Sequence, residues 1–320
     1  MRSASLFVLL GMAAVCALFA VPAQAAQRDR VFVASYGSDS NPCTFGSPCK
    51  TFQQAVNVVA AGGEVTAIDS AGFGPVTISQ AVTITSPNGV EAGIAASPGG
   101  SAVSIAAGQN DVIVLSGLTL EGAGTASSGI ALNGAGNLEV INCAIRNYTT
   151  AGIYVIPSGP TSTTVLVSNT IVSDTSVGGV GGIVILSSSG TIQAALDHVT
   201  INNSGVGLDV SAEGQPIEVQ VADSHIDNNI DVGVSIFGFS TSSVSNVIMR
   251  DVTLNQTPTA ISLQQDSNLW LSGVTQQSST AGSTTSIAFS GTNNAANSDQ
   301  TNHLMGTMTG GGSLTPWSMQ

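Results

Sequence analysis

Basic residues are scarce in this chain. Its 320 residues contain six Lys and Arg against 19 Asp and Glu, and charged residues make up 8% of the sequence. Nucleic acids and anionic lipids are bound through clustered basic side chains, so this balance excludes both as partners. Aromatic residues make up 4%, which leaves few rings on which a ligand could stack. Scarce Lys and Glu beside many small and β-branched residues disfavour helices and favour strands.

Long apolar runs are also rare, and the clearest one, Leu6 to Val21, lies near the start of the chain. Arg2 precedes it and the small residues of Ala23–Ala25 follow it, an arrangement typical of a signal peptide. The run is shorter than the roughly 20 residues that a membrane-spanning helix needs. We therefore expect a signal peptide over residues 1–25 and a secreted, periplasmic or cell-surface protein without membrane insertion. With five Lys and Arg against 19 Asp and Glu, the mature chain would carry a net charge of −14.

Three cysteines follow residue 25. Cys43 and Cys49 bracket a five-residue loop, and a disulfide between them is the default expectation in an exported protein. A two-cysteine metal site is the alternative, but no nearby His or third Cys completes it. Cys143 lies within an apolar repeat, where we expect a buried free thiol.

Two short phrases repeat along the chain, and the first returns after 22 to 30 residues, a period typical of solenoids. Its copies are Leu115–Leu120, Val140–Ile145, Leu166–Ile171, Leu196–Ile201, Val221–Ile226, Met249–Leu254 and Leu271–Gln276. The second phrase starts with Gly in five of its copies, which are Gly129–Leu132, Gly152–Val155, Gly182–Ile185, Gly207–Val210, Gly233–Ile236, Ala260–Leu263 and Ser286–Phe289. Identical phrases at one long period indicate parallel, in-register stacking, whereas an antiparallel sandwich would predict hairpin pairs.

Three strands per repeat predict an all-β fold, a right-handed parallel β-helix built of three sheets. We expect an amino-terminal cap over residues 26–63, the β-helix over 64–291 and a cap or flexible tail over 292–320. A capping box and an apolar stripe predict a short helix over Thr51–Ala61 that covers the amino-terminal end of the tube. One aliphatic stack should fill the core, formed by Ile130, Ile153, Ile183, Leu208, Val234, Ile261 and Ile287.

The repeat phrases resemble those of the right-handed parallel β-helix, or pectin lyase-like, superfamily. The opening Val31–Cys43, together with Pro48–Phe52 and Gly62–Val65, is similar to a group of uncharacterised exported bacterial β-helix repeat proteins. The resemblance covers roughly Val31 to Phe289 and implies the fold. It implies no reaction, because one fold hosts many functions.

Aligning the phrases places residues in columns that should run along the tube. The third place predicts a bend between two sheets, where polar side chains bond neighbouring backbone; it contains Gly117, Asn142, Ser168, His198, Asp223, Asp251 and Gly273. A second polar series predicts a ladder of side chains along another bend: Asn147, Ser173, Asn203 and Asn228. The fifth place should face solvent; it contains Thr119, Ala144, Thr170, Thr200, His225, Thr253 and Thr275.

Ionisable residues concentrate in three consecutive repeats. Candidate catalytic residues are Asp223, His225, Arg250 and Asp251, since two carboxylates can act as acid and base in glycoside hydrolysis. Carboxylates can also hold Ca²⁺ while an Arg or His acts as the base of an elimination. Candidate ligand-binding residues complete the set: Asp197, His198, Asp227 and the aromatic residues Tyr154 and Trp270, with Tyr148 as a third outer-face platform.

Two functions of different classes remain open. The first is an exported, non-enzymatic binding or structural module that faces carbohydrate, with a polysaccharide or a cell-surface glycan as partner. The alternative is a polysaccharide lyase or glycoside hydrolase acting on an outer face of the tube. The ionisable repeats offer Arg250 as their only Lys or Arg, which favours the first. No calcium-binding nonapeptide, nucleophile elbow, phosphate loop or zinc-ligand spacing is present, so we expect no metal or cofactor, and Ca²⁺ only with the alternative.

Overall fold

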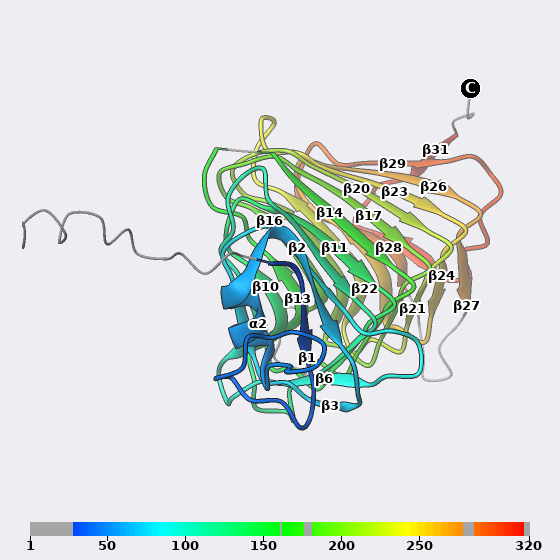
Figure 1. Ribbon diagram of the computed structural model, residues 1–320. Coiled ribbons are helices and arrows are strands. Elements are labelled where there is room, and N and C mark those ends of the chain that lie inside the picture. Colours follow the sequence, from blue (N-terminus) through cyan, green and yellow to red (C-terminus); the bar gives the residue numbers. More distant parts are fainter. Residues whose placement is uncertain (1–27, 161, 176–180, 278–284, 317–320) are drawn as a thin grey trace, which may run out of the picture.

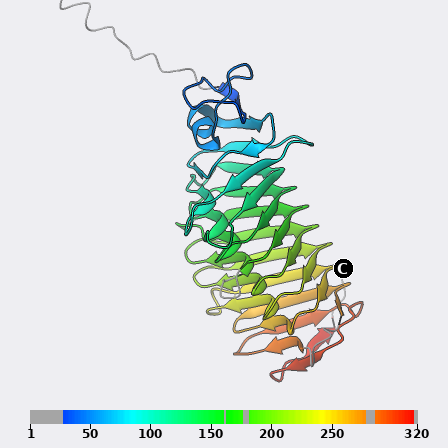
Figure 2. The ribbon, with the colours of Figure 1, turned by 90° about the horizontal axis from the view of Figure 1, so that it is seen from below.

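The computed structural model describes residues 28–160, 162–175, 181–277 and 285–316, and the expected signal peptide lies outside these ranges. The chain winds into coils that stack along one axis, from the blue amino-terminal end to the red carboxy-terminal end (Figures 1 and 2). Each regular coil contributes one strand to each of three parallel sheets. The predicted right-handed three-sheet β-helix is therefore confirmed. No helix in the described ranges is long and apolar enough to cross a bilayer.

Along each regular coil the chain passes through sheet 1, then sheet 2, then sheet 3. Sheet 1 has twelve strands: β1 (Arg28–Val33), β2 (Val59–Ala67), β5 (Val82–Thr85), β8 (Val112–Ser116), β11 (Asn137–Ile141), β14 (Thr163–Ser168), β17 (Ile192–Asp197), β20 (Ile217–Ala222), β23 (Ser245–Arg250), β26 (Ser267–Ser272), β29 (Ala295–Ser298) and β31 (Leu314–Pro316). Sheet 2 has nine short strands: β3 (Ala71–Gly72), β6 (Ala92–Ala95), β9 (Leu118–Glu121), β12 (Ala144–Arg146), β15 (Ile171–Ser173), β18 (Thr200–Asn202), β21 (His225–Asp227), β24 (Thr253–Asn255) and β27 (Thr275–Gln277).

Sheet 3 contains the glycine-led phrases and has ten strands: β4 (Val76–Ile78), β7 (Ser101–Ile105), β10 (Ser128–Leu132), β13 (Ala151–Val155), β16 (Gly181–Ser187), β19 (Val206–Ala212), β22 (Val232–Gly238), β25 (Thr259–Leu263), β28 (Thr285–Phe289) and β30 (Thr307–Thr309). Beyond residue 291, β29 and β31 extend sheet 1 and β30 extends sheet 3, in parallel pairing.

The predicted aliphatic stack is confirmed. Ile153 pairs with Ile130 and Ile183, the same register continues to Ile287, and all seven side chains are fully buried. Glycine precedes five of the seven stack residues because of close packing, and Ala260 and Ser286 precede the other two. A Cβ on Gly152 would lie 2.3 Å from Cγ1 of Val172, and one on Gly182 would lie 2.5 Å from Cγ2 of Ile201. Glycine lets the strand of sheet 3 pass this close to the side chains of sheet 2.

The bend from sheet 1 to sheet 2 is made by one residue in the left-handed region. Its φ is positive in every regular coil: Gly117 (71°), Asn142 (53°), Asn169 (47°), His198 (53°), Asp223 (47°), Asp251 (52°) and Gly273 (63°). Glycine, Asn, Asp and His tolerate this conformation better than other residues. The third place was therefore correctly assigned to a bend. The polar side chains at this place were also predicted to hydrogen-bond to neighbouring backbone. Within the described residues, the side chains of His198, Asp223 and Asp251 form no such hydrogen bond.

One repeat phrase was placed one residue too early. Val167 pairs with Val140 and Leu196, so the third copy runs from Val167 to Val172 instead of Leu166 to Ile171. Adjacent apolar residues at both ends of this phrase made the alternation ambiguous. Consequently Ile171 takes the outward fifth place and is 51% exposed. Thr170, which was expected at the fifth place, is buried. The bend place of this coil belongs to Asn169 instead of Ser168, and the ladder place to Asp174 instead of Ser173.

The second polar series forms the predicted ladder along the bend from sheet 2 to sheet 3. Asn203 donates from Nδ2 to Oδ1 of Asp174 (3.2 Å), and Asn228 donates to Oδ1 of Asn203 (2.5 Å). Asn147 donates to Oε1 of Glu121 in a neighbouring coil. Each donor and its acceptor come from successive coils, so the ladder fixes their spacing.

The amino-terminal helix is shorter than predicted. Helix α2 spans Phe52–Val58, and Thr51 is its N-cap, whose side chain accepts from the backbone N–H of Gln54. From Val59 the chain is extended and joins β2, which pairs with β1. Strand pairing thus ends the helix before the two glycines that were expected to stop it. Figures 1 and 2 show the helix at the blue end of the tube, which confirms the capping prediction.

Cys43 and Cys49 form the predicted disulfide, with Cα atoms 4.6 Å apart. Cys143 is a free, buried thiol, as expected. Burial raises the pKa of this thiol to about 11, because the thiolate would lose its hydration inside the tube.

We predict that Ile183→Asp prevents folding or lowers the free energy of unfolding by more than about 3 kcal/mol, because it places an unpaired charge in the buried stack. Ile183→Val keeps the stack apolar and should lower it by about 0.5–1.5 kcal/mol. Chemical denaturation followed by circular dichroism measures both. Equal stability of the Asp variant and the wild type would contradict the position of Ile183 in the core.

The disulfide is tested by alkylating the unfolded, unreduced protein. Mass analysis of the chain without residues 1–25 should show one labelled cysteine, Cys143. After reduction, three cysteines should be labelled. Three labels without reduction would contradict the disulfide.

The left-handed bend predicts a selective effect at Asn142. Replacement by Val should destabilise the protein by about 1–2 kcal/mol, because a β-branched side chain clashes in this conformation. Asn142→Gly should have a much smaller effect. If both variants unfold at the same denaturant concentration, backbone conformation does not determine this column.

Candidate functional site

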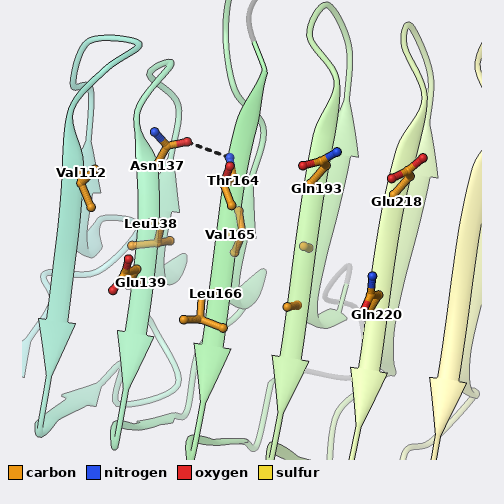
Figure 3. A pocket seen from close by; sticks show the side chains of 12 residues that line it. Val112, Asn137, Leu138, Glu139, Thr164, Val165, Leu166, Gln193, Glu218 and Gln220 are labelled. Atoms are coloured by element: carbon orange, nitrogen blue, oxygen red, sulfur yellow. Dashed lines mark hydrogen bonds between the residues drawn. The ribbon is translucent and has the colours of Figure 1, made fainter.

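The outer face of sheet 1 carries a trough that runs across successive coils. Strands alternate inward and outward residues, so every second side chain of β8, β11, β14, β17 and β20 faces this trough (Figure 3). A cavity of about 580 Å³ lies over these strands. Its outward lining residues are Val112, Asn137, Glu139, Thr164, Leu166, Gln193, Ala195, Glu218 and Gln220.

The trough continues over β23 and β26. A second cavity of about 400 Å³ shares Glu218 and Gln220 with the first and ends at Ile248 and Trp270. Both volumes fall in the range of ordinary ligand sites, about 300–1,000 Å³. The small side chain of Ala195, between Leu166 and Gln220 in one column, helps to hollow the centre. The trough is thus a mixed surface of amide, apolar and carboxylate groups, and no Lys or Arg lines it.

Two predicted site residues lie at the edge of this face. Asp197 and Arg250 occupy one column of sheet 1, with Ala222 between them. Only Met249 separates Arg250 from Ile248 along β23, so both side chains face outward. Within the described residues, Arg250 forms no salt bridge, whereas Arg30 pairs with Glu64 and Arg146 with Glu121.

Three of the predicted ligand and catalytic residues come together at the bend beyond this edge. Asp197, His198 and Asp223 each present a donor atom within 4.8 Å of the others. Nδ1 of His198 lies 3.0 Å from Oδ2 of Asp197. Hydrogen bonding to Asp197 and the nearby carboxylate charges raise the pKa of the His198 imidazole. Asp251 follows Asp223 in the same column, one coil further on.

His225 and Asp227 lie beyond the bend, on sheet 2. His225 is exposed and pairs in register with Thr200 and Thr253. Asp227 is half-buried, and this burial raises the pKa of its carboxyl group, although Oδ1 accepts from the backbone N–H of Asn255 (3.1 Å). The four candidate catalytic residues therefore occupy three places: Arg250 on sheet 1, Asp223 and Asp251 at the bend, and His225 on sheet 2.

The aromatic residues do not share one face. Trp270 lines the trough, whereas Tyr154 is half-buried on sheet 3. The expectation for Tyr148 was wrong: its side chain is buried and 1% exposed. It follows the left-handed residue Asn147, which turns the next side chain inward, and Gly122 leaves space for the ring. Burial raises the pKa of the Tyr148 hydroxyl.

The sequence analysis missed most of the trough. Leu166, Ala195, Gln220 and Ile248 are outward residues of the strands that lead into each repeat phrase. Ala195, Gln220 and Ile248 each directly precede a repeat phrase, and Leu166 was predicted to be the first residue of one. The alternation that directs every second side chain of these strands inward also directs the residues between them outward. It could have predicted that Trp270 and Ile248 share an outward column.

The family model described as "Right handed beta helix region" matches residues 65–221. This match agrees with the right-handed parallel β-helix that the structure shows. No curated protein matches its sequence.

Several solved structures share the fold. A structure titled "Crystal structure of pectate lyase Pel9A" has a TM-score of 0.59 at 11% identity, covering 90% of this chain and 79% of its own. An alginate lyase from Paenibacillus sp. str. FPU-7 has a TM-score of 0.57 at 15% identity, covering 88% of this chain and 98% of its own. XylC in complex with xylose has a TM-score of 0.53 at 11% identity, covering 78% and 70%. At these identities the likeness establishes the fold alone.

Proposed function

We propose that the protein is an exported, non-enzymatic binding module whose ligand is a neutral polysaccharide lying along the trough of sheet 1. The observation that carries this proposal is the lining of the trough. Amide side chains such as Gln193 and Gln220 can donate to and accept from sugar hydroxyls. Leu166, Ile248 and Trp270 offer apolar surface and one ring for stacking.

Charge argues for a neutral ligand. Glu139 and Glu218 lie in the trough, and a uronate polymer placed there would meet two carboxylates without a facing Lys or Arg. Arg250, at the edge, is one cation where an acidic polymer needs several. The net charge of −14 for the chain without residues 1–25 acts in the same direction.

The arrangement of ionisable groups supports binding over catalysis. Acid and base must both reach the bond that is cleaved. Arg250 faces outward from sheet 1, while His225 lies on sheet 2, around the bend from the trough. The alternative, a polysaccharide lyase or glycoside hydrolase, is favoured by the structural neighbours, which include a pectate lyase and an alginate lyase.

Binding is predicted to depend on Trp270. In affinity electrophoresis or calorimetry against neutral polysaccharides, Trp270→Ala should weaken binding about 10-fold or more, since truncating a Trp that anchors a binding surface typically costs about 2 kcal/mol or more. Tyr154→Ala, on sheet 3, is the matched control and should bind like the wild type. If only the Tyr154 variant lost binding, the ligand would bind on sheet 3 and the trough would not be the binding site.

The protein should show no turnover of pectate, alginate or other uronate polymers. A polysaccharide panel, assayed with and without Ca²⁺ for new reducing ends and for the absorbance of unsaturated products, measures this. Cleavage that is abolished by Asp223→Ala would overturn the non-enzymatic proposal. In that case Asp251, Arg250 and His225 would be the next residues to substitute.

A further inference from the structure

We propose that Asp197, His198 and Asp223 form a binding site for a divalent transition-metal ion, with Zn²⁺ as the best-suited member of that class. The site lies at the bend between sheets 1 and 2 and joins two successive coils. It does not depend on the ligand proposed for the trough.

Geometry is the first support. Zn²⁺ binds imidazole nitrogen and carboxylate oxygen at about 2.0–2.2 Å, so two donors on one ion lie roughly 3–3.5 Å apart. Nδ1 of His198 and Oδ2 of Asp197 are already 3.0 Å apart. A carboxylate oxygen of Asp223 lies within 4.8 Å of both partners' donor atoms. Asp223 is exposed, so a side-chain rotation can close the remaining distance.

The donor set selects the kind of ion. One imidazole with two carboxylates suits Zn²⁺ and its neighbours in the first transition row. Ca²⁺ takes six to eight oxygen ligands, and His198 offers nitrogen. Three protein donors leave positions on the ion for water.

The second support is that the bend does not need these carboxylates. Elsewhere in the chain, Asp side chains in turns accept hydrogen bonds from backbone N–H groups: Asp39 from Lys50 and Thr51, and Asp111 from Gly108. Within the described residues, the carboxylate of Asp223 accepts no hydrogen bond. In the same part of the chain, the imidazole of His198 is the only hydrogen-bond partner of the Asp197 carboxylate.

The same columns show that simpler residues suffice for the backbone. Glycine or Asn makes the bend in the coils of Gly117, Asn142 and Asn169, and Ser116 and Ser168 stand in the column of Asp197. The three ligand-type side chains are therefore additional to what folding requires.

These columns also supply the test variants. His198→Asn, Asp223→Asn and Asp197→Ser each introduce a residue that the chain already uses in that column, so the fold should be retained. The matched control is His225→Thr, because Thr200 and Thr253 flank His225 in its own column. It removes another exposed imidazole without touching the proposed site.

The experiment is calorimetric titration of ZnCl₂ into the untagged, disulfide-intact protein at a fixed pH, with circular dichroism to verify folding. We expect one Zn²⁺ per chain. Each of the three site variants should bind Zn²⁺ at least about 10-fold more weakly, because losing even an outer-shell partner of a metal ligand typically lowers metal affinity by about 10–100-fold. His225→Thr should bind like the wild type.

The proposal would be overturned by absence of Zn²⁺ binding, by unchanged affinity in folded His198→Asn, or by an equal loss of affinity in His225→Thr. Ca²⁺ binding that exceeds Zn²⁺ binding and persists in His198→Asn would also overturn it. Because the readout is the metal alone, none of these results depends on whether the trough binds a polysaccharide.

Discussion

The structure depends on parallel, in-register hydrogen bonding between coils, with about 4.8 Å between neighbouring strands. Each regular coil must turn from sheet to sheet at corresponding places to keep this register. A single left-handed residue makes the turn from sheet 1 to sheet 2, so that column is restricted to Gly, Asn, Asp and His. Three of these four residue types are polar, and two are metal ligands. Backbone geometry thus concentrates polar chemistry along one edge of the tube.

The bends also create a hydrogen-bonding problem that neighbouring coils solve. A residue that follows a bend directs its N–H along the axis, where buried hydroxyl and amide groups of the next coil accept it. Cys143 donates to Oγ1 of Thr170 and Val199 donates to Oγ of Ser224. Ser204 donates to Oδ1 of Asn229 in the same manner. These buried polar side chains are explained by the fold, which separates them from the exposed residues at the bends.

Much of the fold was predictable because stacking forces the same residue types to recur. The aliphatic stack, the bend column and the disulfide follow from spacing and chemistry alone. The errors arose where spacing was locally ambiguous: Leu166 and Val167 are both apolar, and only pairing with the neighbouring coils identifies which one points inward. Helix α2 ended early for a similar reason, because pairing with β1 takes Val59 into a strand. Alternation gives the outward positions of the trough, but the residue types at these positions vary from coil to coil, so no recurring residue marks them as a site.

A rigid stack of this kind can hold charged side chains close together without any role in folding. Asp197, His198 and Asp223 are exposed or half-exposed, where ion pairs contribute little to stability. Their proximity is therefore not explained by the stability of the tube, because Gly117 and Asn142 form the corresponding bends of other coils without these groups. The trough and the Asp–His–Asp edge beside it are best treated as two surfaces with separate ligands. The trough offers extended contact to a chain of uncharged units, while the edge offers three donor atoms to a single ion.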